Sequence, residues 1–233
     1  MSAPYVLVTG ATRGIGRAIA LRFAREGCNV AAAARDAGPV DEVVREIEDA
    51  GGKGLPVQLN VRDHGSVESA VYRVLQWGAG RLDCLINNAG TFDIKPFGDL
   101  TPADWDRQIE TNLTGPFWVT LEAFEGLEES DCGHVINIAS VAAKQGFAGN
   151  AAYCASKYGL RGFSDALRLD LAEKDIRVST VYPGSTDTSI WDGIPGDWDR
   201  SKMASPESVA EVVWQTWSAP RDQNVDDVEC PAG

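Results

Sequence analysis

Short apolar runs alternate with longer amphipathic stretches along almost the whole chain, and this alternation limits its fold more than any other feature. The runs are YVLVTG, NVAAAAR, GLPVQLNV, LDCLINNAG, HVINIAS and RVSTVYPG. Each ends in, or is directly followed by, glycine or polar residues, which is typical of a buried parallel strand whose carboxyl end faces a ligand. Helices are expected between them, near residues 14–26, 40–50, 65–77, 102–127, 150–175 and 206–217. This order predicts an α/β fold with a doubly wound parallel sheet and helices on both faces.

The C-terminal NVDDVEC could add a seventh, edge strand to this sheet. Because no repeat, low-complexity tract or linker interrupts the pattern, we expect a single domain over residues 1–233. Thr101-Pro102 and Ser205-Pro206 read as a cap followed by a first-turn proline, so each should begin a helix. Pro116 falls inside the expected helix 102–127 and should kink it.

Composition excludes several classes of protein. The net charge of −13 argues against nucleic acid or an anionic membrane as a partner, since both would be repelled. No run approaches the ~18 apolar residues of a membrane span, and the start lacks a secretion signal, so the cytoplasm is expected. The five cysteines and two histidines show no metal-ligand spacing, so we expect reduced thiols and no metal.

The first expected strand leads into TGATRGIG, in which Gly10, Gly14 and Gly16 precede an amphipathic helix. Glycines at such a turn let backbone N–H groups and the helix N-terminus approach a pyrophosphate. The spacing differs from the usual dinucleotide fingerprint, and a glycine-rich turn can also be purely steric. Its place at the first strand-to-helix turn favours a dinucleotide site.

The end of the second expected strand bears on the choice of dinucleotide. NAD sites usually have an acidic residue there that binds the ribose 2′-hydroxyl, whereas a 2′-phosphate requires a cation. Ala34 leaves the acidic position vacant, Arg35 follows it, and Arg13 could reach the same phosphate. NADP(H) is therefore the expected cofactor. The alternative is that Arg35 only faces solvent and Asp36 binds the ribose.

Tyr153 stands four residues before Lys157 in AAYCASKYGL, so both share a helical face among small neighbours. A free phenol has a pKa of about 10. A cation about 4 Å away, at an effective dielectric near 20, would favour the phenolate by roughly 4 kcal/mol and bring the pKa to about 7. A phenol with that pKa could exchange a proton with a carbonyl or an alcohol.

Six ordered motifs together resemble the short-chain dehydrogenase/reductase family: TGATRGIG, NNAG at 87–90, NLTG at 112–115, Ser140, YCASK and PG at 183–184. The resemblance covers essentially the whole chain and implies a Rossmann-type fold. It assigns Tyr153 as the acid/base and Lys157 as its tuner and ribose ligand. It also implies that Ser140 donates a hydrogen bond to the substrate oxygen, while Asn112 holds a water that links Lys157 to solvent.

The same resemblance implies the cofactor contacts. It places the phosphates near Gly10, Arg13, Gly14, Ile15, Gly16 and Arg35, the adenine near Asn60 and Val61, its ribose near Asn87, Ala89 and Gly90, and the nicotinamide near Pro183, Gly184, Thr186 and Thr188. Tyr153 and Lys157 also belong to this cofactor set. Asn60 stands where the family commonly has Asp. The short C-terminal tail lacks the usual glycine-rich strand, which puts the C-terminal tetramer contacts in doubt.

Residues 189–202 are expected to form a substrate lid, in which Trp191 and Trp198 flank Gly and Pro hinges. Tryptophans there suggest an apolar or ring-bearing substrate, unless they only pack on the core. The implied function is an NADPH-dependent carbonyl reductase, reversible as an alcohol dehydrogenase and forming a homodimer or homotetramer. The alternatives are a 3-oxoacyl thioester reductase and a non-catalytic NADP-sensing regulatory protein.

Overall fold

The computed structural model describes residues 3–230 and contains a seven-stranded sheet in the order β3-β2-β1-β4-β5-β6-β7. Every neighbouring pair of strands is parallel, and the order reverses between β1 and β4. The expected doubly wound parallel sheet is therefore confirmed, including its seventh strand. The strands are β1 (Tyr5–Thr9), β2 (Asn29–Ala34), β3 (Lys53–Gln58), β4 (Cys84–Asn87), β5 (His134–Ile138), β6 (Arg177–Tyr182) and β7 (Asp227–Glu229).

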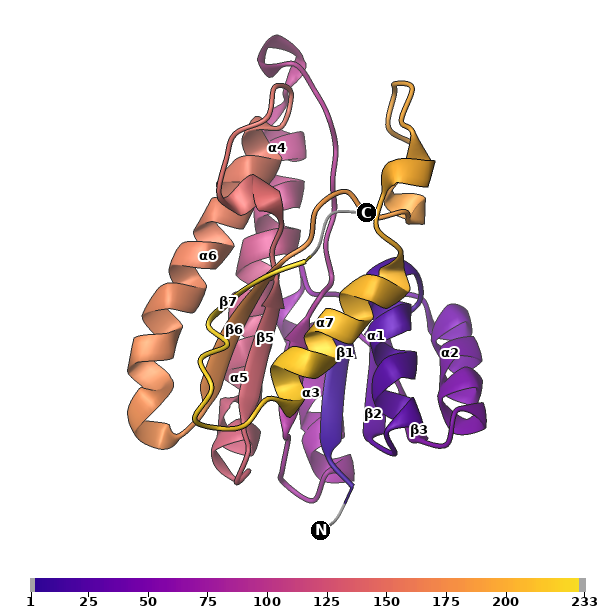
Figure 1. Cartoon of the computed structure of the whole chain (residues 1–233), viewed down its shortest axis with the longest axis vertical. Coiled ribbons are helices and arrows are strands. Elements are labelled where there is room, and N and C mark those ends of the chain that lie inside the picture. The colour runs from indigo at the N-terminus through magenta and orange to yellow at the C-terminus, as the bar shows by residue number, and fades with distance from the viewer. Residues whose placement is uncertain (1–2, 231–233) are drawn as a thin grey trace.

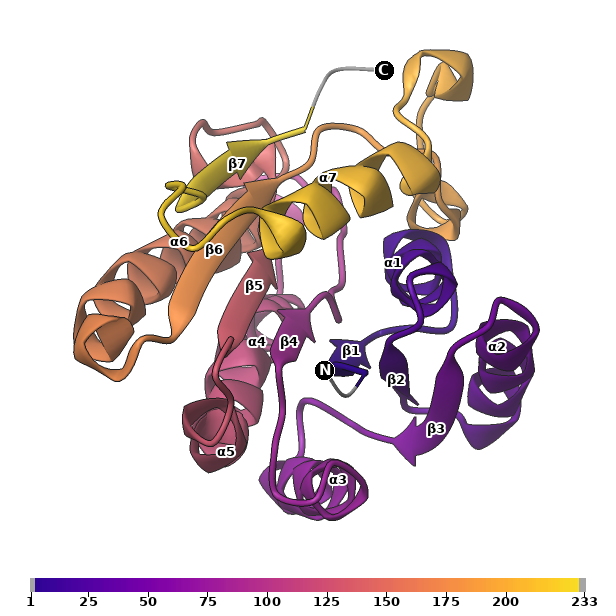
Figure 2. The ribbon, with the colours of Figure 1, turned by 60° about the horizontal axis from the view of Figure 1, so that its bottom comes forward.

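Helices cover both faces of the sheet (Figures 1 and 2). One face carries α1, α2 and α7, and the other carries α3, α5 and α6, with α4 leading into α5. The helices are α1 (Gly14–Arg25), α2 (Ala37–Asp49), α3 (His64–Trp77), α4 (Pro102–Ile109), α5 (Gly115–Glu128), α6 (Ala151–Leu171) and α7 (Pro206–Ser218). No helix in the described part of the chain is long and apolar enough to cross a membrane.

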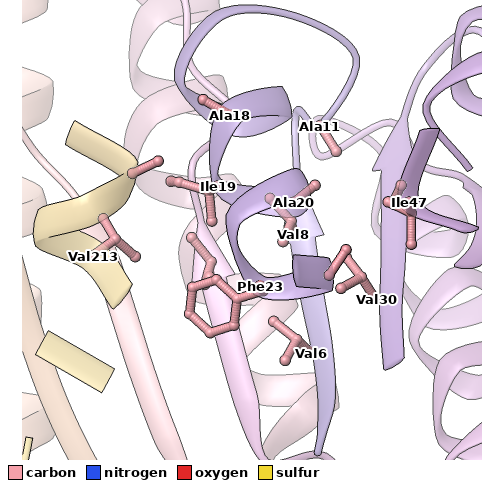
Figure 3. Packing of buried hydrophobic residues seen from close by; sticks show 14 of the residues in the cluster. Val6, Val8, Ala11, Ala18, Ile19, Ala20, Phe23, Val30, Ile47 and Val213 are labelled. Atoms are coloured by element: carbon pink, nitrogen blue, oxygen red, sulfur yellow. The ribbon is translucent and has the colours of Figure 1, made fainter. Parts of the chain in front are cut away.

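Alternate residues of the central strands pack into two hydrophobic layers, one on each face of the sheet. Val6 and Val8 of β1 pack toward α1, where Phe23 is fully buried, and toward Val213 of α7 (Figure 3). Leu7, between the two valines, packs in the opposite layer with residues of α3 and α5. Burying both faces of the strands explains why their sequences are almost continuously apolar.

Side-chain caps fix where two of the helices begin. Thr101 and Asp104 form a reciprocal capping box at the start of α4, and Ser205 accepts a hydrogen bond from Ser208 N at the start of α7. The expected single helix over 102–127 is wrong in detail, because a π-helical segment, Glu110–Thr114, separates α4 from α5. Pro116 follows within the first turn of α5, where its missing N–H is tolerated.

Because all strands are parallel, their carboxyl ends meet at one edge of the sheet. Gly10, Arg35, Asn88, Ser140 and Pro183 each lie at or just beyond such an end, and each lines the same cavity at that edge. In open α/β sheets, ligands bind in the crevice outside the carboxyl ends where the strand order reverses. The topology therefore makes this cavity the expected ligand site.

Candidate active site

An elongated cavity of about 760 Å³ runs across the carboxyl edge of the sheet. It extends from the end of β2, at Arg35 and Asp36, to Trp191 and Trp198 in the segment after β6. Most of the residues that the sequence nominated line it: Gly10, Arg13, Gly14, Ile15, Gly16, Arg35, Asn60, Val61, Ala89, Gly90, Ser140, Tyr153, Lys157, Pro183, Gly184, Thr186 and Thr188.

The glycine turn between β1 and α1 requires its glycines. Gly10 and Gly14 have φ of +66° and +54°, a backbone conformation that other residues rarely adopt. A Cβ on Gly16 would lie 2.2 Å from Gly10 O, so only glycine fits. The helix begins at Gly14 with backbone N–H groups free of an Arg13 side-chain cap, which leaves them available to an anion.

Arg13 and Arg35, which were nominated for a 2′-phosphate, both have exposed side chains that line the cavity. Ala34, which precedes Arg35, also lines the cavity, so no carboxylate occupies the position where NAD sites usually have one. Asp36, the alternative ribose ligand, also lines the cavity. Arg62, which sequence reasoning did not nominate, lines it as well but is paired with Glu110, at 2.6 Å between Arg62 Nη2 and Glu110 Oε2.

Tyr153 and Lys157 lie on the first two turns of α6, and both line the cavity. The Lys157 ammonium donates a hydrogen bond to Ile138 O at 2.9 Å, and it lies 5.8 Å from the centroid of the Tyr153 ring. Lys157 is only 5% exposed. The shared helical face is therefore present, with the ammonium anchored on the backbone at the end of β5.

The expected pKa of about 7 for Tyr153 is wrong for the protein without ligands. Burial raises the pKa of Tyr153 to about 12, although a hydrogen bond with Ser140 opposes this. Burial also lowers the pKa of Lys157 to about 8. The physical reason is that desolvation disfavours both charged forms, the phenolate and the ammonium.

Ser140 ends the β5 region and caps the short 3₁₀ helix Val141–Ala143, accepting a hydrogen bond from Ala142 N at 3.1 Å. The same hydroxyl is within hydrogen-bonding reach of Tyr153. It therefore ends the strand, as its position suggests, and it lies beside the tyrosine in the lining of the cavity.

Asn112 is fully buried in the π-helical segment and does not line the cavity. Its side chain accepts from Thr91 N at 2.8 Å, and it donates to Thr91 O at 2.9 Å and Ser156 Oγ at 3.0 Å. It thereby joins the loop after β4 to α6 next to Lys157. This arrangement gives Asn112 a positioning role, whereas the water link remains a prediction.

Asn87 and Asn88, the two asparagines of the NNAG motif, make different contacts. Asn87 is buried and outside the cavity lining, since its amide donates to Thr120 and Asn137. Asn88 lines the cavity and donates to the carbonyls of Thr9 and Gly10, at 2.9 and 3.1 Å. The residue that braces the glycine turn is thus the second asparagine, whereas Asn87, which was nominated for the adenine ribose, lies outside the cavity lining.

Sequence reasoning missed the aromatic residue Phe92. Its ring makes edge contacts with Tyr153, at 4.8 Å between centroids, and with Trp191, at 5.3 Å. Trp191 in turn packs on Trp198 at 5.0 Å. We call Phe92, Trp191 and Trp198 the aromatic wall. A possible signal for Phe92 was its place two residues after NNAG, at the carboxyl edge of the sheet.

The segment 189–202 is held more firmly than its glycines and aspartates suggest. Arg200 binds Asp187 at 2.5 Å, Asp192 at 2.9 Å and Thr188 O at 2.9 Å. The indole N–H of Trp191 donates to Thr186 O at 3.0 Å. These polar contacts anchor part of the expected lid, and its closure on a substrate stays a prediction.

Comparison with known proteins gives a consistent result. A family model described as short chain dehydrogenase matches residues 4–197. Sepiapterin reductase of Chlorobaculum tepidum is 33% identical over 230 residues, covering 96% of this chain and 93% of that protein. The 3-oxoacyl-acyl-carrier-protein reductase FabG of Thermotoga maritima is 34% identical over 215 residues, or 89% and 87% of the two chains. A crystal structure of a metagenomic short-chain oxidoreductase in complex with NADP superposes with a TM-score of 0.85 at 31% identity, covering 100% of this chain and 99% of that one.

Proposed function

Since this chain belongs to the short-chain dehydrogenase/reductase family and is an NADP-dependent oxidoreductase, we propose that it reduces a small ketone to a secondary alcohol and catalyses the reverse oxidation. The observation that carries this proposal is the convergence of Ser140, Tyr153 and Lys157 on one cavity. The other end of the same cavity offers a glycine turn and two arginines.

The residues present fit NADP(H). Backbone N–H groups at the start of α1 suit the pyrophosphate, and Arg13 and Arg35 suit a 2′-phosphate. Lys157 would hold the nicotinamide ribose from the floor of the cavity. When bound, the reduced cofactor supplies a hydride to the carbonyl carbon.

The chain's own residues then handle the proton. A phenol whose pKa is raised to about 12 stays protonated at neutral pH, so Tyr153 can donate its proton to the carbonyl oxygen. The Ser140 hydroxyl, which lines the same cavity beside Tyr153, would donate a hydrogen bond to the same oxygen. Hydride on carbon and proton on oxygen complete the alcohol, and the Lys157 ammonium favours the phenolate that Tyr153 becomes.

The test is a panel of carbonyl compounds assayed through NADPH absorbance. Tyr153→Phe should lower turnover by at least about 100-fold, because proton transfer contributes roughly 10²- to 10⁴-fold. NADPH affinity should stay within a few-fold, since the ring remains. Tyr158→Phe is the matched control, on the same helix but 45% exposed and outside the cavity lining. Normal activity of Tyr153→Phe would refute the assignment.

A second candidate function is the reduction of 3-oxoacyl thioesters. The observation that favours it is the similarity to the Thermotoga maritima protein of that name. Acetoacetyl-CoA in the same panel separates the two candidates, because the second predicts a higher kcat/KM for the thioester than for any free ketone. A non-catalytic NADP sensor would bind NADPH and turn over no compound of the panel.

We also propose that the enzyme acts in the cytoplasm as a homodimer or homotetramer. Large apolar side chains exposed on α5 and α6 support the assembly. The composition supports the location, as argued from the sequence.

A further inference from the structure

We infer that the substrate carries an aromatic ring, and that Phe92 is the residue that selects it. This inference rests on the proposed carbonyl reduction, and it names the substrate class for that site. Phe92 is the member of the aromatic wall that contacts the Tyr153 ring. A ring attached to the reacting carbonyl would therefore lie within reach of Phe92.

The aromatic wall continues outward from the tyrosine without interruption. The ring planes of Phe92 and Tyr153 meet at 68°, those of Phe92 and Trp191 at 67°, and those of Trp191 and Trp198 at 48°. All four rings line the cavity. Edge-to-face contacts of this kind are favoured by aromatic quadrupoles, so a substrate ring on this wall gains more than its apolar area alone provides.

The wall is assembled before any substrate binds. The Trp191 indole is fixed by its bond to Thr186 O, and Arg200 ties the segment on either side of it. A Cβ on Gly196 would lie 2.9 Å from the Trp198 ring, so that tryptophan packs directly against the backbone. A surface ordered in advance loses less conformational entropy on binding, which favours a rigid ligand.

Charge at this end of the cavity favours a neutral ring. Arg107 is a charged residue that lines the cavity near the aromatic wall, and it has no assigned cofactor contact. Its guanidinium is paired with Asp93 at 2.9 Å, and Asp93 adjoins Phe92. The cation therefore has an acidic partner, and the ring of Phe92 lies directly beside Tyr153.

The experiment compares acetophenone with cyclohexyl methyl ketone, which has the same carbon skeleton but a saturated ring. The measured quantity is the ratio of their kcat/KM values with NADPH, so the intrinsic reactivity of each ketone cancels between variants. Phe92→Leu should lower the ratio by roughly 3- to 10-fold, the usual worth of an aromatic pair beyond its buried area. The loss should fall mainly on KM for acetophenone.

Two variants keep the test interpretable. Phe97→Leu makes the same change five residues later, at a ring that is 82% exposed and outside the cavity lining, and it should leave the ratio unchanged. Phe92→Tyr keeps the ring and should retain at least half of the wild-type ratio. An unchanged ratio in Phe92→Leu would overturn the inference. Failure of the unmodified enzyme to reduce any ketone in the panel would instead overturn the proposed function.

Discussion

The ammonium group of Lys157 is buried and almost completely shielded from water. Its side chain is 5% exposed and has a backbone carbonyl, Ile138 O, as its hydrogen-bond partner. The fall of its pKa from 10.5 to about 8 corresponds to roughly 3 kcal/mol of stability. Because the folded pKa lies below the unfolded one, this cost is full below pH 8 and diminishes as the pH rises toward 10.5.

Lys157→Met should therefore stabilise the cofactor-free protein while it damages function. We expect the free energy of unfolding at pH 7 to rise by about 1–2 kcal/mol, less than the full cost because Ile138 O loses its donor. Turnover and NADPH affinity should both fall. Urea unfolding of both proteins at pH 7 and pH 10 tests this, since the difference should shrink at the higher pH. Destabilisation at pH 7 would contradict it.

Tyr153 should remain a neutral phenol in the cofactor-free protein well beyond neutral pH. With its pKa raised to about 12, its phenolate absorbance should be missing below about pH 10. A near-ultraviolet pH titration of the unmodified protein minus that of Tyr153→Phe isolates this residue. A phenolate signal with a midpoint near pH 7 would instead restore the value predicted from the spacing of Tyr153 and Lys157.

The choice of cofactor is predicted to depend on Arg35 and the vacant acidic position at Ala34. NADPH should be preferred over NADH, because a charge-assisted bond to phosphate is worth roughly ten- to hundred-fold in affinity. Ala34→Asp with Arg35→Ala should reverse the preference, measured as kcat/KM for each cofactor. Equal values in the unmodified enzyme would mean that Arg35 only faces solvent.

Some site residues can be predicted from sequence motifs, whereas the contacts of others depend on the tertiary structure. The glycines and the Tyr153–Lys157 pair could be located from their local spacing, whereas Ser140 could be assigned only through the family resemblance. Which of Asn87 and Asn88 faces the cavity depends on the pleat of β4, and both asparagines look equivalent in sequence. The pKa of Tyr153 depends on burial and on the place of the Lys157 ammonium, neither of which can be read from a four-residue spacing.

At the scale of elements, the π-helical segment between α4 and α5 is the feature that sequence could not anticipate. Its residues, Glu110–Thr114, include the weak helix formers Thr111, Asn112 and Thr114, but these residue types do not specify a π-helical turn. Pro116 indicated only that the helix should be distorted nearby. The wider turn coincides with Asn112, whose amide bonds both Thr91 backbone groups. Such bulges often occur where a helix presents a functional side chain, and here it joins the loop after β4 to α6.

The tryptophan side chains of the lid at 189–202 are already held by their contacts, but its backbone amides should become more protected stepwise as ligands bind. Thr188 touches the glycine turn, because a Cβ on Gly14 would lie 3.0 Å from its methyl group, so a bound cofactor would brace the start of the lid. Hydrogen exchange across the lid should slow with NADP and slow further with a ketone. Arg200→Ala should speed exchange in the cofactor-free protein by releasing Asp187 and Asp192. Core-like protection before any ligand is added would exclude a lid.

At the scale of the whole molecule, α5 and α6 both expose large apolar side chains. Phe117 and Leu121 on α5 are 44% and 54% exposed, and Tyr158 and Leu169 on α6 are 45% and 78% exposed. Apolar groups gathered on neighbouring helices are typical of an interface between copies. Light scattering should therefore report a dimer or tetramer at micromolar concentration.

Leu121→Glu should weaken that assembly, because it would bury a carboxylate in an interface of two chains that each carry a net charge of −13. Tyr72→Glu on α3, at a residue 65% exposed, is the matched control and should leave the mass unchanged. An unmodified protein that is monomeric would refute the prediction outright.

The overall architecture was predictable because it depends on many residues at once. Six apolar runs and six amphipathic stretches each tolerate an error of two or three residues at their ends without changing the sheet. The strand order β3-β2-β1-β4-β5-β6-β7 could not be predicted from the alternation alone, because parallel pairing with right-handed crossovers permits more than one doubly wound order. The aromatic wall was only half predicted, because Phe92 meets Trp191 across almost a hundred residues of sequence, and no local pattern connects them.

The parallel sheet also places the cavity at its carboxyl edge and, among the described residues, leaves the opposite, amino edge free of those that line the cavity. The loops that precede β4 and β5 lie at the amino edge of the sheet, and exposed residues there, such as Ala79 and Asp131, are absent from the cavity lining. A dye, a surface tether or a fused protein attached at either position would point away from the reacting groups. The enzyme could therefore be immobilised on a support by that edge with its entrance still open to solution.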